Sequence, residues 1–228
     1  MPTILDSAIM ISDAYHASND AAGNPQLSAG TLPLGSAWQI IKFVDHTAEG
    51  GDAAAIFKNS VTNEVFIAGR GTATGSDAAP DIGIALGVAP NERISDAQAI
   101  LASVRRDYPD STINAGGHSL DGEVWAKVSE RDSQHIDVLA INAPNSTNDA
   151  DIYDASHVTA ISAKWDLVGH WGPDYPNAIN LDTGSEPLNQ FGDNGTHSVT
   201  NTIVNGIANN PALATSQLGQ VDPVAVIG

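Results

Sequence analysis

The residues best suited to chemistry lie in the stretch Ala115-Gly-Gly-His-Ser-Leu-Asp-Gly122, which separates a predicted strand from a predicted helix. A serine between glycines at such a junction is typical of a tight turn that lifts the serine hydroxyl above the sheet. Gly117 leaves room for the helix, because a side chain two residues before the serine would collide with it. We therefore predict that Ser119 is a nucleophile. The alternative is that Ser119 only caps the helix, since serine is favoured at helix N-termini.

Two blocks of the sequence resemble the class 3, fungal-type triacylglycerol lipase family. The first is Gly117-His118-Ser119-Leu120, followed by Asp121 and Gly122, which is similar to the family's Gly-His-Ser-Leu-Gly-Gly. The second is Gly69-Arg70-Gly71-Thr72 after a predicted strand, which is similar to Phe-Arg-Gly-Thr. The resemblance implies an α/β-hydrolase fold, with a mixed, mainly parallel sheet flanked by helices, and ester hydrolysis. It also implies an oxyanion hole made by the N–H groups of Thr72 and Leu120, where two donors would stabilise developing charge.

The chain order of α/β-hydrolases is serine, acid, histidine, so both partners of Ser119 must follow it. Asp166 comes directly after a predicted strand, a position from which a carboxylate can orient an imidazole. Of the two histidines beyond it, His170 is too near in sequence to reach Ser119, whereas His197 lies in a loop before a predicted helix. The predicted triad is therefore Ser119, Asp166 and His197. Asp174 is the next candidate for the acid, and a solvent-facing role is the alternative for His197.

Asp121 departs from the glycine that the family has two residues after the nucleophile. A carboxylate in the first turn of a helix is favoured by the helix dipole by about 0.3 to 1 kcal/mol. Its negative charge would oppose the oxyanion, so the sequence alone predicts that Asp121→Gly raises kcat. The amphipathic lid helix of the family is also not visible, and Thr72 to Leu86 in its place contains few large apolar residues. We therefore expect short- or medium-chain esters as substrates.

Hydrophobic periodicity predicts the elements that position these residues. Apolar residues at helical spacing predict a helix from Leu5 to Tyr15. Strands are predicted at 38–44, 53–57, 64–68, 111–115, 136–141, 158–162 and 178–181, and further helices at 95–108 and 120–130. This order predicts a mixed sheet that is parallel at its centre. We expect a single α/β-hydrolase domain over residues 1–228, with a short lid or mobile loop at 72–91 and a loose tail after about residue 210.

Composition limits the class of partner. The 228 residues contain 27 acidic and 9 basic side chains, a formal net charge of −18. This charge disfavours nucleic acids and anionic lipid surfaces, so we expect a small-molecule or lipid ester substrate, no nucleic-acid partner and no stable membrane anchor. The absence of cysteine excludes disulfides and zinc–thiolate sites. No cofactor or metal is predicted, although calcium stays open because acidic loops are plentiful without forming a known calcium motif.

The sequence leaves other functions and the setting of the protein open. A non-catalytic binding module could share this fold, and an acyl transferase or a peptidase could use the same triad. No conventional secretory signal is visible at the N-terminus, so we expect a cytoplasmic protein or secretion by a route independent of a signal peptide. The oligomeric state is not predicted.

Overall fold

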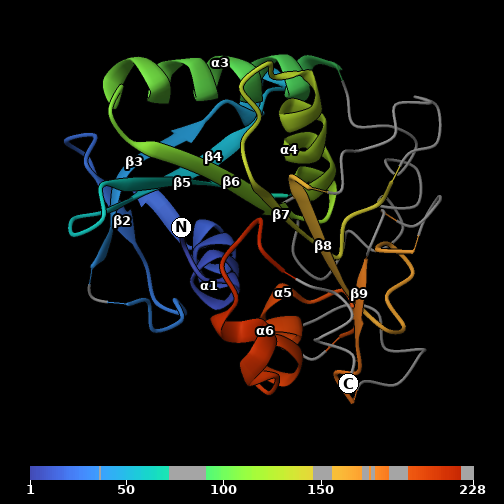
Figure 1. Cartoon of the computed structure of the whole chain (residues 1–228). Coiled ribbons are helices and arrows are strands. Elements are labelled where there is room, and N and C mark those ends of the chain that lie inside the picture. The colour runs from blue at the N-terminus through green and yellow to red at the C-terminus, as the bar shows by residue number, and fades with distance from the viewer. Residues whose placement is uncertain are drawn as a thin grey trace.

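The computed structural model describes residues 1–35, 37–71, 91–145, 156–170, 175, 178–184 and 195–221. Its centre is a seven-stranded sheet (Figure 1). The strands in spatial order are β3 (Trp38–Asp45), β4 (Ala53–Asn59), β5 (Glu64–Gly69), β6 (Thr112–His118), β7 (Val138–Ile141), β8 (Val158–Ala163) and β9 (Ile179–Leu181). The pairs β3–β4 and β4–β5 are antiparallel, and every pair from β5 to β9 is parallel. The predicted mixed, mainly parallel sheet is confirmed.

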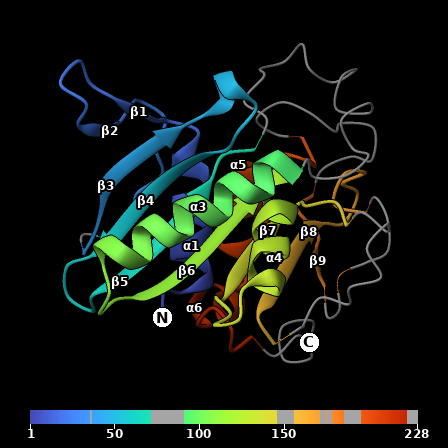
Figure 2. The same ribbon diagram turned by 90° about the horizontal axis from the view of Figure 1, so that it is seen from above.

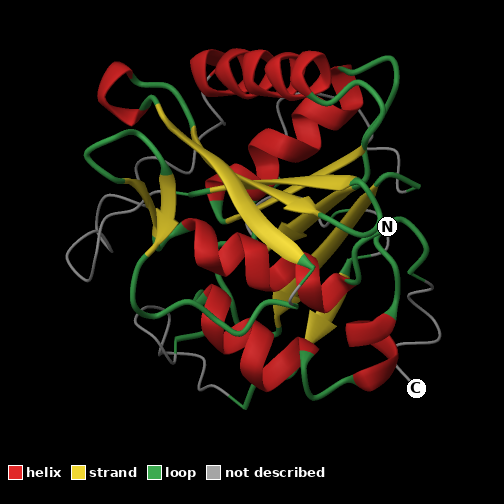
Figure 3. Ribbon diagram, turned by 90° about the vertical axis from the view of Figure 1, so that its left-hand side faces the viewer, coloured by secondary structure: helices red, strands yellow, loops and turns green. Residues whose placement is uncertain are grey.

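Helices cover both faces of this sheet (Figures 1 and 3). On one face lie α3 (Asn91–Asp107) and α4 (Leu120–Arg131), and on the other lie α1 (Ile4–Ala14), α5 (Val199–Asn201), η2 (Thr202–Ile207) and α6 (Pro211–Thr215). Because successive side chains of a strand point to opposite faces, strands β4, β5, β7 and β8 each contribute to two hydrophobic cores. In β4, for example, Ile56 packs in the core beneath α3 and α4, while the next residue, Phe57, packs in the core with α1.

A small hairpin and a short helical turn were not predicted. Strands β1 (Ala17–Asn19) and β2 (Pro25–Leu27) pair antiparallel and lie beside the β3 edge of the main sheet (Figure 2). The 3-10 turn η1 (Thr47–Glu49) connects β3 to β4. Three-residue elements are too short to display a hydrophobic period, so pattern analysis does not detect them.

Several element boundaries differ from the sequence-based expectation by one to three residues, and two expectations are further from the structure. Helix α3 begins at Asn91 rather than at Ser95, because the buried side chains of Ile94 and Ala97 extend its apolar face by one turn. The expected loose tail after about residue 210 is wrong for residues 211–221, where α6 forms and Leu213 and Leu218 are completely buried. The expected lid at 72–91 lies outside the described residues, except for Asn91. In the described part of the chain, no helix has both the length and the apolar character to span a membrane.

Candidate active site

Ser119 occupies a sharp turn between the end of β6 and the start of α4. Its backbone has φ 58° and ψ −134°, a conformation that is uncommon and strained for a residue other than glycine. The main-chain N–H of Ser119 donates to the carbonyl of Ile141 at 2.9 Å, which fixes the turn against β7. A Cβ on Gly117 would lie 2.5 Å from the carbonyl carbon of Asp121, so only glycine fits there, as predicted. The turn therefore presents the serine hydroxyl at the carboxyl end of the parallel strands.

The structure brings Ser119, His197 and Asp166 together from three distant segments. The Nε2 atom of His197 lies 3.0 Å from Oγ of Ser119. Its Nδ1 atom lies 3.1 Å from both carboxylate oxygens of Asp166. Ser119 is 8 % exposed, His197 6 % and Asp166 0 %, so this chain of contacts is largely shielded from bulk water. The predicted partners of Ser119 are thus within hydrogen-bond distance of one another.

The Asp166 carboxylate is held by main-chain groups as well as by the histidine. Its Oδ1 accepts from the N–H of Val168 at 3.0 Å, and its Oδ2 accepts from that of Gly169 at 3.1 Å. An ionised carboxylate only accepts hydrogen bonds, so Nδ1 of His197 must carry the proton that it shares with Asp166. Nε2 is then left as an acceptor for the Ser119 hydroxyl. This is the tautomer that a general base requires.

His118 supports His197 from the elbow itself. Nε2 of His118 lies 2.7 Å from the main-chain carbonyl of His197, and Nδ1 lies 2.8 Å from the hydroxyl of Tyr15. Because a carbonyl only accepts, Nε2 carries the hydrogen and the Tyr15 hydroxyl donates to Nδ1. Burial is the main reason that the pKa of His118 lies well below its usual value, and repulsion from the nearby His197 ring lowers it further. The His118 imidazole is therefore neutral. His118 thus packs beside the candidate base.

Tyr15 and Asn142 are site residues that the sequence did not reveal. Asn142 directly follows β7 and has φ 49°. Its amide nitrogen donates to the hydroxyl of Thr202 at 2.9 Å and its oxygen accepts from Ala163 at 2.9 Å, which joins the element after His197 to the end of β8. The one available signal was a polar residue at the carboxyl end of an apolar strand. Tyr15 gave no signal, because its place in the pattern is that of an ordinary helix residue.

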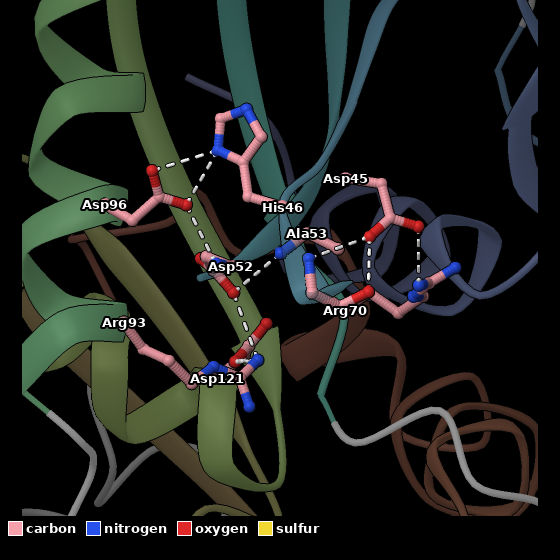
Figure 4. Close-up of polar contacts among 9 residues, drawn as sticks. Asp45, His46, Asp52, Ala53, Arg70, Arg93, Asp96 and Asp121 are labelled. Carbon is pink, nitrogen blue, oxygen red and sulfur yellow. Dashed lines mark hydrogen bonds and ion pairs between the residues drawn. The ribbon is translucent and has the colours of Figure 1, made fainter. Parts of the chain in front are cut away.

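Of the two residues expected to donate to the oxyanion, Leu120 lies within the described residues and Thr72 does not. The N–H of Leu120, at the start of α4, has no acceptor among the described residues. Gly71 lies against the elbow, since a Cβ on it would be 2.5 Å from the carbonyl oxygen of His118 and 3.4 Å from Cβ of Ser119. Thr72 lies outside the described residues, so its role stays a prediction. Arg70 pairs with Asp45 at 3.1 Å (Figure 4).

The remaining elbow residues begin α4. Gly122 packs closely on Ala143, where a Cβ would approach to 2.5 Å. The Asp121 carboxyl is completely buried and contacts the guanidinium of Arg93 from α3 (Figure 4). Within the described ranges, no three or more histidine, aspartate or glutamate side chains are grouped so that they could hold a metal ion.

A parallel sheet that starts antiparallel, with a serine on a strand–turn–helix junction, defines the α/β-hydrolase fold. The structure is similar to a mutant form of MDLA from Penicillium cyclopium (TM-score 0.55, 11% identity, covering 93% of this chain and 94% of that one). It is also similar to Lip2 lipase from Yarrowia lipolytica (TM-score 0.52, 15% identity, 78% and 77%) and to its nonglycosylated form (TM-score 0.51, 15% identity, 93% and 93%). No family model and no curated protein matches the sequence. The predicted resemblance to fungal-type lipases is thus confirmed at the level of the fold.

Proposed function

We propose that this chain is a serine hydrolase that cleaves carboxylic esters, with Ser119 as nucleophile, His197 as base and Asp166 as the acid that orients the base. One observation carries the proposal. The hydroxyl of a serine in a strained turn lies 3.0 Å from an imidazole nitrogen whose other nitrogen lies 3.1 Å from a buried carboxylate. Nucleophile, base and orienting group within hydrogen-bond reach form the arrangement that activates a serine. The similarity in fold to Lip2 lipase supports an ester as substrate.

In the first half of the reaction, the Ser119 proton moves to Nε2 of His197 while Oγ forms a bond to the ester carbonyl carbon. The N–H groups of Leu120 and Thr72 stabilise the negative charge that develops on the carbonyl oxygen, each donor contributing about 100- to 1,000-fold in rate. The bond from the carbonyl carbon to the alcohol oxygen then breaks. His197 returns its proton to the leaving alkoxide, so that an alcohol departs and an acyl-enzyme remains.

In the second half, water takes the place of the alcohol. His197 removes a proton from the water, and the resulting hydroxide oxygen bonds to the acyl carbon. The bond to Oγ of Ser119 breaks, and the proton on His197 returns to Oγ. A carboxylic acid leaves and the enzyme is restored. Asp166 remains ionised throughout, holding the imidazole in one tautomer and stabilising its charged form.

We further propose short- or medium-chain acyl esters as substrates. The support is compositional, because the sequence between Thr72 and Leu86 offers few large apolar side chains for gripping a long chain. A panel of p-nitrophenyl esters from acetate to palmitate measures this preference directly. A kcat/KM that rises steadily toward palmitate, or strong activation at an oil–water interface, would contradict it.

The decisive experiment is covalent labelling with a fluorophosphonate probe, combined with p-nitrophenyl ester hydrolysis. We expect the wild-type chain to be labelled and Ser119→Ala to lose both the label and nearly all hydrolysis. Ser60→Ala is the matched control, because Ser60 is exposed in the turn between β4 and β5. A non-catalytic module would not be labelled. An acyl transferase would be labelled but would pass most acyl groups to an added alcohol rather than to water.

His197→Ala and Asp166→Asn test the other two roles. We expect each to lower kcat by at least about 1,000-fold, because the members of a triad act as a unit and the asparagine loses control of the imidazole tautomer. A near-normal rate in Asp166→Asn would transfer the acid role to another residue, with Asp174 as the next candidate.

A further inference from the structure

Two arginine–aspartate pairs join α3 to α4, one at each end of the helices. At the carboxyl-terminal ends, Arg105 donates to both oxygens of Asp132, at 2.8 and 2.5 Å. At the amino-terminal ends, Arg93 contacts Asp121, two residues after Ser119. The first pair is partly exposed, whereas the Asp121 side chain is 0 % and that of Arg93 12 % exposed. The two pairs allow a matched comparison, because only the second one lies at the elbow.

The pair at the elbow includes a second buried carboxyl group, that of Asp52 (Figure 4). Oδ1 of Asp52 lies 3.1 Å from Nη2 of Arg93, the same nitrogen that contacts Asp121. This oxygen also accepts from the N–H of Ala53 at 2.9 Å, and the N–H of Asp52 donates to Asp96 at 2.8 Å. Asp52 is therefore fixed from several sides. Groups from α3, α4 and the start of β4 meet at a single guanidinium nitrogen.

Two carboxyl groups share one cation at this point, in a site largely closed to water. Leaving both carboxyls ionised would bury a net negative charge, which costs several kcal/mol even after relaxation. Burial raises the pKa of Asp121 well above its usual value, and the negative charge of Asp52 raises it further. Burial also raises the pKa of Asp52, but the guanidinium of Arg93 and the N–H of Ala53, which both contact its Oδ1, lower it. The proton therefore resides on Asp121, and Arg93 balances the charge of Asp52.

Other charged or titratable groups face Asp121 from β5 and α1. The guanidinium of Arg70, just after β5, lowers the pKa of Asp121, but this cation is already paired with Asp45 at 3.1 Å. Tyr15, just after α1, is neutral, because burial raises the pKa of its phenol above the usual range. On α4 itself, the uncharged indole nitrogen of Trp125 and Oδ2 of Asp121 both lie near Gly69, where an added Cβ would lie within 3.0 Å of each of them. Arg93 is thus the principal counter-charge.

This arrangement corrects the sequence-based expectation that Asp121→Gly raises kcat. That expectation assumed an unbalanced carboxylate beside the oxyanion, whereas the Asp121 carboxyl faces Arg93 and holds a proton. Removing the side chain would leave Arg93 and Asp52 beside a cavity at the turn that carries Ser119. We therefore expect the glycine variant to be slower than the wild type.

We propose that Asp121 is a positioning residue for the nucleophile, and that it holds one proton in a neutral buried clasp formed by Asp52, Arg93 and Asp121. The buried clasp fixes the first turn of α4 against α3 and β4, and through it the strained backbone of Ser119 at φ 58°. The effect of the buried clasp on catalysis rests on the proposed serine hydrolase function, whereas the existence of the buried clasp does not.

The activity test compares Asp121→Asn, which keeps the shape and volume of the side chain, with two leucine variants, whose side chain is larger and apolar. Asp121→Asn stays neutral and keeps its contacts, so we expect its kcat within about 3-fold of the wild type. Asp121→Leu cannot bond to Arg93, so we expect kcat to fall about 10-fold or more with little change in KM, because the nucleophile is displaced. Asp132→Leu breaks only the outer pair and is the matched control, with a kcat near that of the wild type. A wild-type kcat in Asp121→Leu, or an equal loss in Asp132→Leu, would overturn the proposal.

The stability test does not depend on hydrolysis. The pKa of Asp121 in the folded state lies above the unfolded value of 3.8. The stability that this carboxyl group contributes to the folded protein is therefore full below pH 3.8 and is lost as the pH rises through the folded-state pKa. Asp121→Asn removes this loss. In urea unfolding, we therefore expect the stability of the Asn variant relative to wild type to increase between about pH 6 and about pH 9.

The same relative stability at both pH values would overturn the buried clasp, even if Asp121→Leu fails to fold. A failure of the proposed function looks different. A wild-type chain that neither hydrolyses esters nor reacts with the fluorophosphonate would remove the serine hydrolase assignment, while the urea comparison would still decide whether Asp121 holds a proton.

Discussion

At the scale of single residues, each member of the candidate triad is fixed by hydrogen bonds that involve main-chain groups. Two N–H groups fix the Asp166 carboxylate, and the carbonyl of His197 accepts from His118. The N–H of Ser119 is bonded to β7. Because these contacts also determine which imidazole nitrogen carries a proton, they determine the direction in which a proton can move. Removing the Tyr15 hydroxyl, which bonds to His118 and is not itself part of the triad, is therefore expected to change the rate of catalysis through His118.

Tyr15→Phe tests this expectation. The variant removes the donor to Nδ1 of His118, so that His118 can adopt either tautomer and its bond to the His197 carbonyl weakens. We expect kcat to fall about 10-fold with KM nearly unchanged, and stability to fall by about 1 to 3 kcal/mol because a buried acceptor is left unpaired. Steady-state kinetics, urea unfolding and nitrogen NMR of the imidazoles measure these effects. Tyr108→Phe is the control, and equal kinetics in the two variants would disprove the role of Tyr15.

At the scale of elements, the sequence was most informative where a segment of regular hydrophobic spacing ends at a glycine or serine that marks a turn. The junction of β6 and α4 was predicted because Gly117 and Ser119 interrupt two clear patterns. The start of α3 was misplaced, since its first turn is stabilised by burial of Ile94 and by the long-range contact of Arg93 with Asp121. Such contacts join residues far apart in sequence, and no local spacing records them. The same reason explains why the bond from Tyr15 to His118 was not predicted.

Helix α1 contains a buried acid that was likewise invisible in the pattern. Asp13 is completely buried, and its Oδ1 accepts from the N–H of Leu32 at 2.8 Å. Its Oδ2 has no hydrogen-bond partner in the described part of the chain. Burial raises the pKa of Asp13 to about 6, although the bond from Leu32 lowers it in part. The carboxyl group thus becomes ionised, at a cost to the folded state, within the neutral pH range.

Asp13→Asn is expected to stabilise the protein in a pH-dependent way. The folded-state pKa of about 6 exceeds the unfolded value of 3.8, so the wild type loses stability as the pH rises between these values. The asparagine variant does not titrate. Its advantage in unfolding free energy is expected to be larger at about pH 8 than at about pH 4 by on the order of 1 to 3 kcal/mol. Urea unfolding at both pH values measures it, and a pH-independent difference would refute the explanation.

At the scale of the whole molecule, segments near both ends of the described chain close the same face of the sheet. The N–H of Ile4 donates to the carbonyl of Ser216 at 2.9 Å, and that of Leu218 to the carbonyl of Pro2 at 3.0 Å. Helix α6 packs on α1, and both belong to the core that also contains Val199 of α5. His197 lies two residues before Val199. The base of the candidate site is therefore attached to a face that depends on the C-terminal segment.

Leu213→Ala and Leu218→Ala test this dependence. Both side chains are 0 % exposed, so each change removes buried methyl groups and leaves a cavity, at an expected cost of about 2 to 5 kcal/mol. Val204→Ala is the control on the neighbouring η2, because that side chain is 47 % exposed and its loss is expected to cost less than about 0.5 kcal/mol. In urea, hydrolytic activity and circular dichroism are expected to decline together in both leucine variants, since releasing this face also releases His197. If activity persisted beyond the spectroscopic transition, or if the leucine variants were as stable as Val204→Ala, the C-terminal segment would not support the base.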